Sequence, residues 1–373
     1  MDFGLDDDHR ALQASVTRLL QRYAPLAQVQ AVAAQDEPTD PALTQALADQ
    51  GLFALLIPID CDGLGLGVME AALAAEALGA CAAPAPYLGP VLASLALTLG
   101  GDAALKKRLL PAIATGSLSP GLAISEASSG ARRNFGVTAS GGRLTGTALA
   151  VVDFATANGF VVASRCGGLF WLESDASGLS KNRLTNIDRT RSLGELQLHN
   201  TPALALDHGD AVQTLRTVEN AARVLVAADT LGAASTMLTR AVAYAQERRQ
   251  FGREIGSFQA VKHLCAEMAS ELEAARALVW YAAHAQDALP DQARLLACHA
   301  KAHLSEVGTF VARTATEVFG GIGITDALGL HLQFKRIGLN RQLFGAPERC
   351  RVEAARAQGL IAPRPNHPAQ AQV

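Results

Sequence analysis

The sequence predicts an α+β protein in which an N-terminal helical domain, a central antiparallel β domain and a C-terminal four-helix bundle follow one another along the chain. The period of the apolar side chains carries this prediction. The period is helical over residues 1–118 and again over residues 210–362, whereas residues 119–209 form short β-rich segments separated by turn residues. Residues 363–373 are proline-rich, and we expect them to form a disordered tail.

The N-terminal domain is expected to begin with an amphipathic helix over residues 6–23, where Leu12 and Val16 lie on one face. Asp40 is the expected N-cap of a second helix, because a short side-chain oxygen can accept the free amides of a first helical turn. The second helix and the later ones are expected over residues 41–50, 68–78, 88–99 and 102–110.

The β domain is predicted from short segments such as GFVVAS and LGELQLH, which alternate with turn residues and favour an antiparallel sheet or a small barrel. The DRTR sequence at residues 188–191 is expected to be a turn of this domain. The C-terminal domain is predicted to contain alanine-rich helices, which can pack closely. Their expected ranges are 211–248, 258–289, 291–319, 327–343 and 346–358.

Composition limits the classes of function. The net charge of −3 excludes a general electrostatic attraction to nucleic acid or to an anionic membrane. The apolar runs are too short to span a bilayer, and the six cysteines show neither a CxxC pair nor a metal-ligand spacing. We therefore expect free thiols, no metal and a cytoplasmic protein. Charged residues make up 18% of the chain, below the usual quarter, which predicts surface buried against another chain.

A cationic corner at residues 247–259, ERRQFGREIGSFQ, is expected to join two long helices. The simplest interpretation is a solvated turn in which Glu247 and Glu254 neutralise the arginines. The alternative is an anion site, because a guanidinium fork matches phosphate oxygens and the start of the next helix adds amide donors. Gln259, on that next helix, would then meet an adenine edge.

A glycine-rich stretch at residues 317–325, EVFGGIGIT, is expected to end a later helix. A C-capping glycine explains one of these glycines. Adjacent glycines also allow a phosphate or a sugar to approach the backbone closely. Together with the cationic corner, this stretch favours a nucleotide that carries a pyrophosphate.

The two stretches resemble the acyl-CoA dehydrogenase family, which combines YAxERxQFGxxIGxFQAVKH with a later FGGIGIT. The resemblance covers nearly the whole chain, since ALADQGLFALLIPIDCDGLGLG and LKKRLLPAIATGSLSPGLAISE also match. It implies α,β-desaturation of an acyl-CoA thioester, in which FAD accepts the hydride and a carboxylate removes the α-proton. The residues implied for the ADP half of FAD are Arg248, Phe251, Gln259, Glu317, Gly320 and Gly321. In this family such residues typically serve the flavin of the neighbouring subunit.

The positions of the family's catalytic base carry no carboxylate in this chain. Gly345 stands where the commonest family pattern has a glutamate, and Glu348, three residues later, is expected to point elsewhere. Ala222 stands at the second known base position. Glu219 lies about one helical turn before it, and is either a displaced base or an ordinary surface glutamate.

The face that would meet the chain's own flavin ring also departs from the family. The usual Thr-Glu-Pro…Gly-Ser-Asp segment is SEASSG at residues 125–130, which lacks the aspartate. The usual Trp-Ile-Thr is Ala150-Val151-Val152, which offers neither an aromatic ring nor a hydroxyl group. The half-site for the chain's own flavin and substrate is therefore eroded, while the half-site for a partner's ADP moiety is intact.

Three functions fit this pattern. The first is a non-catalytic subunit of an α2β2 acyl-CoA dehydrogenase, as in some bacterial members of the family, which are often associated with bulky steroid side-chain thioesters. The second is a self-sufficient homo-oligomeric dehydrogenase that uses Glu219 as its base. The third is a flavin-free acyl-CoA-binding scaffold. The resemblance also implies an electron-transferring flavoprotein as the electron acceptor.

Overall fold

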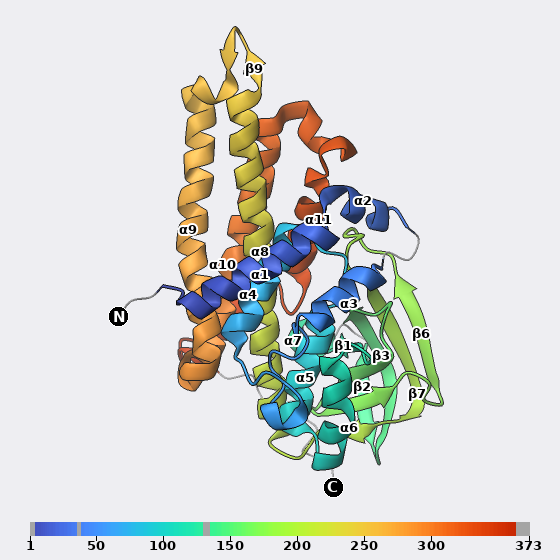
Figure 1. Cartoon of the computed structure of the whole chain (residues 1–373). Helices are drawn as coiled ribbons and strands as arrows, with labels where there is room; N and C mark the ends of the chain where they lie inside the picture. Colours follow the sequence, from blue (N-terminus) through green and yellow to red (C-terminus); the bar gives the residue numbers. More distant parts are fainter. Residues whose placement is uncertain (1–3, 36–38, 130–134, 363–373) are drawn as a thin grey trace.

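The computed structural model describes residues 4–35, 39–129 and 135–362, and its helical, β and helical zones follow one another as predicted (Figure 1). The tail expected to be disordered, residues 363–373, lies outside the described residues. The helices of the N-terminal zone are α1 (Asp7–Tyr23), α2 (Leu26–Ala33), α3 (Pro41–Asp49), α4 (Val68–Ala80), α5 (Leu88–Gly100) and α6 (Ala103–Ala114), with a 3-10 turn η1 (Ile59–Cys61) between α3 and α4.

Aspartate side chains fix the starts of several of these helices. Asp40 accepts a hydrogen bond from the amide of Leu43 at 3.0 Å, which confirms the expected N-cap of α3. Asp102 caps α6 in the same way. Helix α2 is an addition to the predicted set, because its eight residues are too few to display a clear apolar period, although Val29 and Val32 are buried.

The β zone is one sheet with the strand order β6-β7-β3-β1-β4-β5-β8, and β2 pairs with β3. Its strands are β1 (Pro120–Ala123), β2 (Gly136–Ser140), β3 (Arg143–Val152), β4 (Gly159–Ala163), β5 (Leu169–Glu173), β6 (Leu179–Leu184), β7 (Leu193–Pro202) and β8 (Leu204–Ala205). The pairs are antiparallel as predicted except β1 with β4, which is parallel. Parallel strands need a long connection, and here helix α7 (Ser125–Ser129) and the strands β2 and β3 lie between β1 and β4 along the chain. Gly130, the end of the SEASSG segment, lies outside the described residues.

The C-terminal zone is built around helix α8 (Ala211–Glu247), which is about 55 Å long and packs on both neighbouring zones. It is apolar enough to span a membrane by composition, but 83% of its most apolar window is buried, as in a core helix. The other elements are α9 (Gln259–Ala288), α10 (Pro290–Phe319), α11 (Leu330–Gln342), α12 (Pro347–Ala357), the hairpin β9 (Arg249–Gln250) and β10 (Arg253–Glu254), and the 3-10 turns η2 (Ile255–Ser257), η3 (Gly320–Ile324) and η4 (Asp326–Leu328).

Helices α4 and α8 cross in direct backbone contact. A Cβ atom at Gly79 would lie 2.0 Å from the carbonyl oxygen of Asp229, and one at Gly232 would lie 1.8 Å from that of Glu76. Only glycine permits this separation. The two helices therefore touch at the crossing itself.

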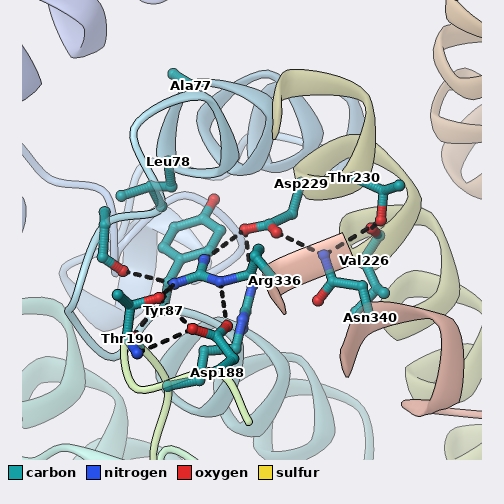
Figure 2. Close-up of polar contacts among 12 residues, drawn as sticks. Ala77, Leu78, Tyr87, Asp188, Thr190, Val226, Asp229, Thr230, Arg336 and Asn340 are labelled. Atoms are coloured by element: carbon teal, nitrogen blue, oxygen red, sulfur yellow. Dashed lines mark hydrogen bonds and ion pairs between the residues drawn. The ribbon is translucent and has the colours of Figure 1, made fainter. Parts of the chain in front are cut away.

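A buried guanidinium, that of Arg336 on α11, joins all three zones (Figure 2). Its Nε atom lies 2.6 Å from Oδ2 of Asp188 in the β zone, and its Nη1 atom lies 3.1 Å from Oδ2 of Asp229 on α8. Its Nη2 atom donates to the carbonyl oxygen of Ala83 at 3.0 Å and to the hydroxyl group of Thr190 at 2.6 Å. The DRTR turn at residues 188–191 thus carries buried partners of Arg336, which sequence alone does not indicate.

Two further side chains complete this group, which we call the Arg336 hub and which comprises Arg336, Asp188, Thr190, Asp229, Arg191 and Asn340. Arg191 donates to Asp229 at 2.7 Å, and the side-chain amide of Asn340 donates to the other oxygen of Asp229 at 2.6 Å. Burial disfavours the charge of Arg336, but Asp188 and Asp229 hold its pKa above the ordinary value for arginine. The hub therefore balances buried charges between segments distant in sequence.

We expect Arg336→Met to lower the free energy of unfolding by about 3–5 kcal/mol, because it leaves buried carboxylates without their cation. Urea denaturation followed by circular dichroism measures this change. Arg351→Met is the matched control, since it breaks only the exposed pair between Arg351 and Glu306 and should cost less than about 1 kcal/mol. Similar small losses in both variants would contradict the role given to the hub.

Candidate functional site

The cationic corner forms a two-stranded hairpin, β9–β10, beyond the end of helix α8 (Figure 1). Phe251 and Gly252 make its tip, with φ angles of 53° and 79°. The side chain of Phe251 is 93% exposed, and its ring meets that of Phe258 edge-on with 6.2 Å between the centroids. The ring of Phe251 is therefore accessible from outside the chain at the tip of the hairpin.

The arginines of the hairpin differ in their partners. Arg249 forms an ion pair with Glu254 at 2.9 Å, so the solvated-turn interpretation holds for this residue. Arg253 stacks on the ring of Phe258 at 3.9 Å. Arg248 is exposed and forms no ion pair with any residue in the described part of the chain. The guanidinium of Arg248 therefore remains available to an anion from outside the chain.

The glycine-rich stretch lies at the same end of the bundle as the hairpin. The rings of Tyr244, one turn before the end of α8, and Phe319, the last residue of α10, are 4.6 Å apart. Gly320 caps α10 with a φ of 65°, and a Cβ atom at Gly320 or Gly321 would meet nothing within 4 Å. All six residues that the resemblance implies for the ADP half of FAD are exposed to solvent. They are Arg248, Phe251, Gln259, Glu317, Gly320 and Gly321.

At the face implied for the chain's own flavin ring, two segments of the chain are bonded to each other. Helix α7 lies on β3, where the hydroxyl group of Ser125 donates to the carbonyl oxygen of Ala150 at 3.0 Å. The carboxylate of Glu126 accepts from the amide of Leu149. The valines at residues 151–152 are fully buried. These hydrogen bonds hold α7 against β3 at the two segments that the family resemblance assigns to the flavin ring.

At the vacant base position, Gly345 follows α11 with a φ of 105°, a conformation that favours glycine. A Cβ atom there would lie 3.5 Å from Nη2 of Arg223 and 3.5 Å from Sγ of Cys350. Arg223 is fully buried, and it donates to the carbonyl oxygen of Phe344 at 3.0 Å and pairs with Glu353 at 2.9 Å. The position thus faces a guanidinium and a thiol in place of a carboxylate.

The other base candidates are also accounted for. Ala222 is fully buried. Glu219 is only 5% exposed and pairs with Arg294 at 2.9 Å, so its interpretation as an ordinary surface glutamate is wrong. Glu348 is exposed and pairs with Arg341 at 2.9 Å, and it therefore points away from Gly345 as expected.

Sequence reasoning did not predict the ion network that surrounds this region. Arg294 bridges Glu219 and Glu353, and it donates to the side-chain oxygen of Asn220 at 2.9 Å. Burial raises the pKa of Glu353, but Arg223 and Arg294 outweigh it and hold the pKa below the ordinary value. The available signal was the position of Arg223 within the apolar run AARVLVAA, because a cation there needs a buried partner.

Comparison with known proteins identifies the family. Residues 6–117 match the model of the acyl-CoA dehydrogenase N-terminal domain, and residues 213–358 match that of the acyl-CoA dehydrogenase C-terminal domain. The chain is 32% identical over 346 residues to the acyl-CoA dehydrogenase IpdE2 of Mycobacterium tuberculosis, covering 91% of this chain and 94% of that protein. The chain therefore belongs to the acyl-CoA dehydrogenase family, whose cofactor is FAD.

Solved structures agree with this assignment. A variant of the Tcur3481–Tcur3483 steroid ACAD is 28% identical with a TM-score of 0.87, covering 95% of this chain and 98% of that one. The ChsE4–ChsE5 complex of Mycobacterium tuberculosis has the same fold, with 24% identity, a TM-score of 0.88, and coverage of 97% and 100%. The predicted fold class is confirmed by these neighbours.

Proposed function

We propose that this chain is the non-catalytic subunit of a hetero-oligomeric, α2β2 acyl-CoA dehydrogenase, in which it completes the FAD site of a catalytic partner. One observation carries the proposal: both family base positions, Gly345 and Ala222, lack a carboxylate, while Arg248 stands exposed at the end of the bundle with no ion-pair partner among the described residues. A homo-oligomer that acted without a second kind of subunit would use Arg248 in the same way, but it would also need a carboxylate at a base position.

The exposed end of the bundle fits the ADP half of FAD. The Arg248 guanidinium can bind phosphate oxygens in a bidentate manner, and Gln259 can donate to and accept from an adenine edge. The backbone at Gly320 and Gly321 is open to close approach, with Glu317 on the preceding helical turn. The chain's own ring face departs from the family, because Ala150-Val151-Val152 offers neither an aromatic ring nor a hydroxyl group.

Bound FAD would supply the acceptor for the hydride that leaves the β-carbon of an acyl-CoA thioester. The carboxylate that removes the α-proton would come from the partner subunit. Arg248 and Gln259 of this chain would bind and orient the cofactor's ADP moiety across the interface. An electron-transferring flavoprotein is the proposed acceptor of the electrons, and the cytoplasm the proposed location.

The names of relatives favour a bulky substrate. The neighbour at 28% identity is a steroid ACAD named for two proteins, and a relative 30% identical over 310 residues is the benzylmalonyl-CoA dehydrogenase of Aromatoleum aromaticum, covering 76% of this chain and 80% of that one. We propose an acyl-CoA thioester with a ring-bearing acyl group.

Arg248→Ala tests the proposal in the complex with the catalytic subunit. We expect FAD to bind about 10- to 100-fold more weakly, since a hydrogen bond between charged groups is lost. Equilibrium dialysis with absorbance detection measures this. Arg249→Ala is the matched control, because Arg249 is already paired with Glu254 and should leave FAD affinity within about twofold. Unchanged affinity in Arg248→Ala would instead support the flavin-free scaffold.

Glu219→Gln tests the self-sufficient alternative. We expect the variant complex to keep its turnover within about twofold, because Glu219 is held by Arg294 and glutamine can still accept that hydrogen bond. Steady-state dehydrogenation of a ring-bearing acyl-CoA measures the rate, and Glu348→Gln is the control glutamate. Loss of the activity in Glu219→Gln alone would identify Glu219 as the base and overturn the non-catalytic role.

A further inference from the structure

Two buried thiols, Cys298 on α10 and Cys350 on α12, pack against each other in the C-terminal zone. Both are 0% exposed, and with Ala302 and Ala354 they form a small cluster separate from the main core. The remaining cysteines in the described part of the chain are exposed or half-buried. The family reaction, as derived above, uses neither buried thiol.

Two buried cations face this pair. Nη1 of Arg223 lies 3.2 Å from Sγ of Cys298. Lys301, one helical turn after Cys298, is 1% exposed, and its ammonium group donates to Ser305 and to the carbonyl oxygen of Arg341, each at 3.1 Å. Positive charge beside a thiol favours the thiolate, which is the reactive form.

The contact between the two thiols separates their acidities. The neighbouring Cys298 lowers the pKa of Cys350 to about 6, with additional help from Arg223 and Lys301, against the opposing effect of burial. The same contact, together with burial, raises the pKa of Cys298. One sulfur is thus prepared as a nucleophile, and the other retains a proton beside it.

The pair is connected to the vacant base position. Sγ of Cys350 lies 3.6 Å from the carbonyl oxygen of Gly345, to which the protonated thiol donates, while Arg223, which contacts Cys298, also holds the carbonyl oxygen of Phe344. Helix α12 is the last described helix, and its outer face includes the exposed Val352. Local opening of such a terminal helix admits a small oxidant.

We propose that Cys298 and Cys350 are a redox-active dithiol that hydrogen peroxide converts reversibly into a disulfide. The Cys350 thiolate attacks one peroxide oxygen, the O–O bond breaks, and after proton uptake water leaves a sulfenic acid on Cys350. The Cys298 sulfur then attacks the Cys350 sulfur, the S–O bond breaks, and the hydroxide takes the Cys298 proton and departs as a second water. Both sulfurs are oxidised, and the peroxide is reduced to two molecules of water.

Oxidation would change the contacts at Gly345. A disulfide cannot donate to the carbonyl oxygen of Gly345 as the Cys350 thiol does, and it replaces the Cys298 thiol to which Arg223 donates. Arg223 then keeps only the carbonyl oxygen of Phe344 and the carboxylate of Glu353 among these partners. Oxidation of the pair would therefore alter the hydrogen bonds around Phe344 and Gly345, where the family has its catalytic base.

The experiment treats the purified full chain, and separately its complex, with equimolar hydrogen peroxide, followed by alkylation in denaturant and peptide mapping. We expect the mass to fall by two hydrogens, Cys298 and Cys350 to escape alkylation together, and one cross-linked peptide pair to appear. Dithiothreitol should restore both thiols.

Three variants complete the test. Cys166→Ser removes the exposed thiol and should leave the cross-link intact. Cys350→Ser and Cys350→Ala should each abolish the cross-link and leave Cys298 alkylatable. If neither variant folds, the peptide map of the wild-type protein still shows whether Cys298 and Cys350 become cross-linked. The proposal is overturned if Cys298 and Cys350 remain free thiols under peroxide that oxidises Cys166, or if the cross-link joins other cysteines.

Discussion

The ion pairs of Arg336 are the interaction on which the arrangement of this chain depends. The guanidinium is fully surrounded by protein, and its partners come from the N-terminal zone, the β zone and α8. A buried charge is tolerated only when its partners are held in place, so the hub fixes three zones with respect to one another. Helix α11, which carries Arg336, leads directly to Gly345, and α8, which carries Asp229, leads to the hairpin at Arg248.

The cationic hairpin and the vacant base position lie in different surroundings within this arrangement. At the hairpin, Arg248 and Phe251 project into solvent, and Arg248 has no ion-pair partner among the described residues. Around the vacant base position, α7 is bonded to β3, and Arg223 fills the space beside Gly345 while pairing with Glu353. The chain therefore keeps the exposed residues that could bind a neighbouring subunit's FAD. At its own base position it has a glycine beside a buried arginine in place of a carboxylate. This physical asymmetry underlies the proposed role of a supporting subunit.

Sequence reasoning was strongest where the signal is local. The helical period of α8 and the ERRQFGREIGSFQ corner are encoded in neighbouring residues. Such local patterns were sufficient to predict the order of the helical and β zones and the resemblance to the family. The Arg336 hub could not be predicted, because Asp188 and Arg336 are 148 residues apart and no local pattern links them. Glu219 was weighed as a surface residue because its partner, Arg294, lies on another helix. Helices α2 and α7 are too short to show a period, and the parallel β1–β4 pair depends on the path of the chain between them.

The most direct test of the central claim is the flavin content of the isolated chain, measured from its visible spectrum together with its mass in solution. The account predicts a folded protein with little or no FAD, which becomes yellow only with a catalytic partner and then holds one FAD for each pair of unlike chains. Nearly one FAD per chain in a homo-oligomer would contradict it, because the chain would then hold a complete flavin site without a second kind of subunit.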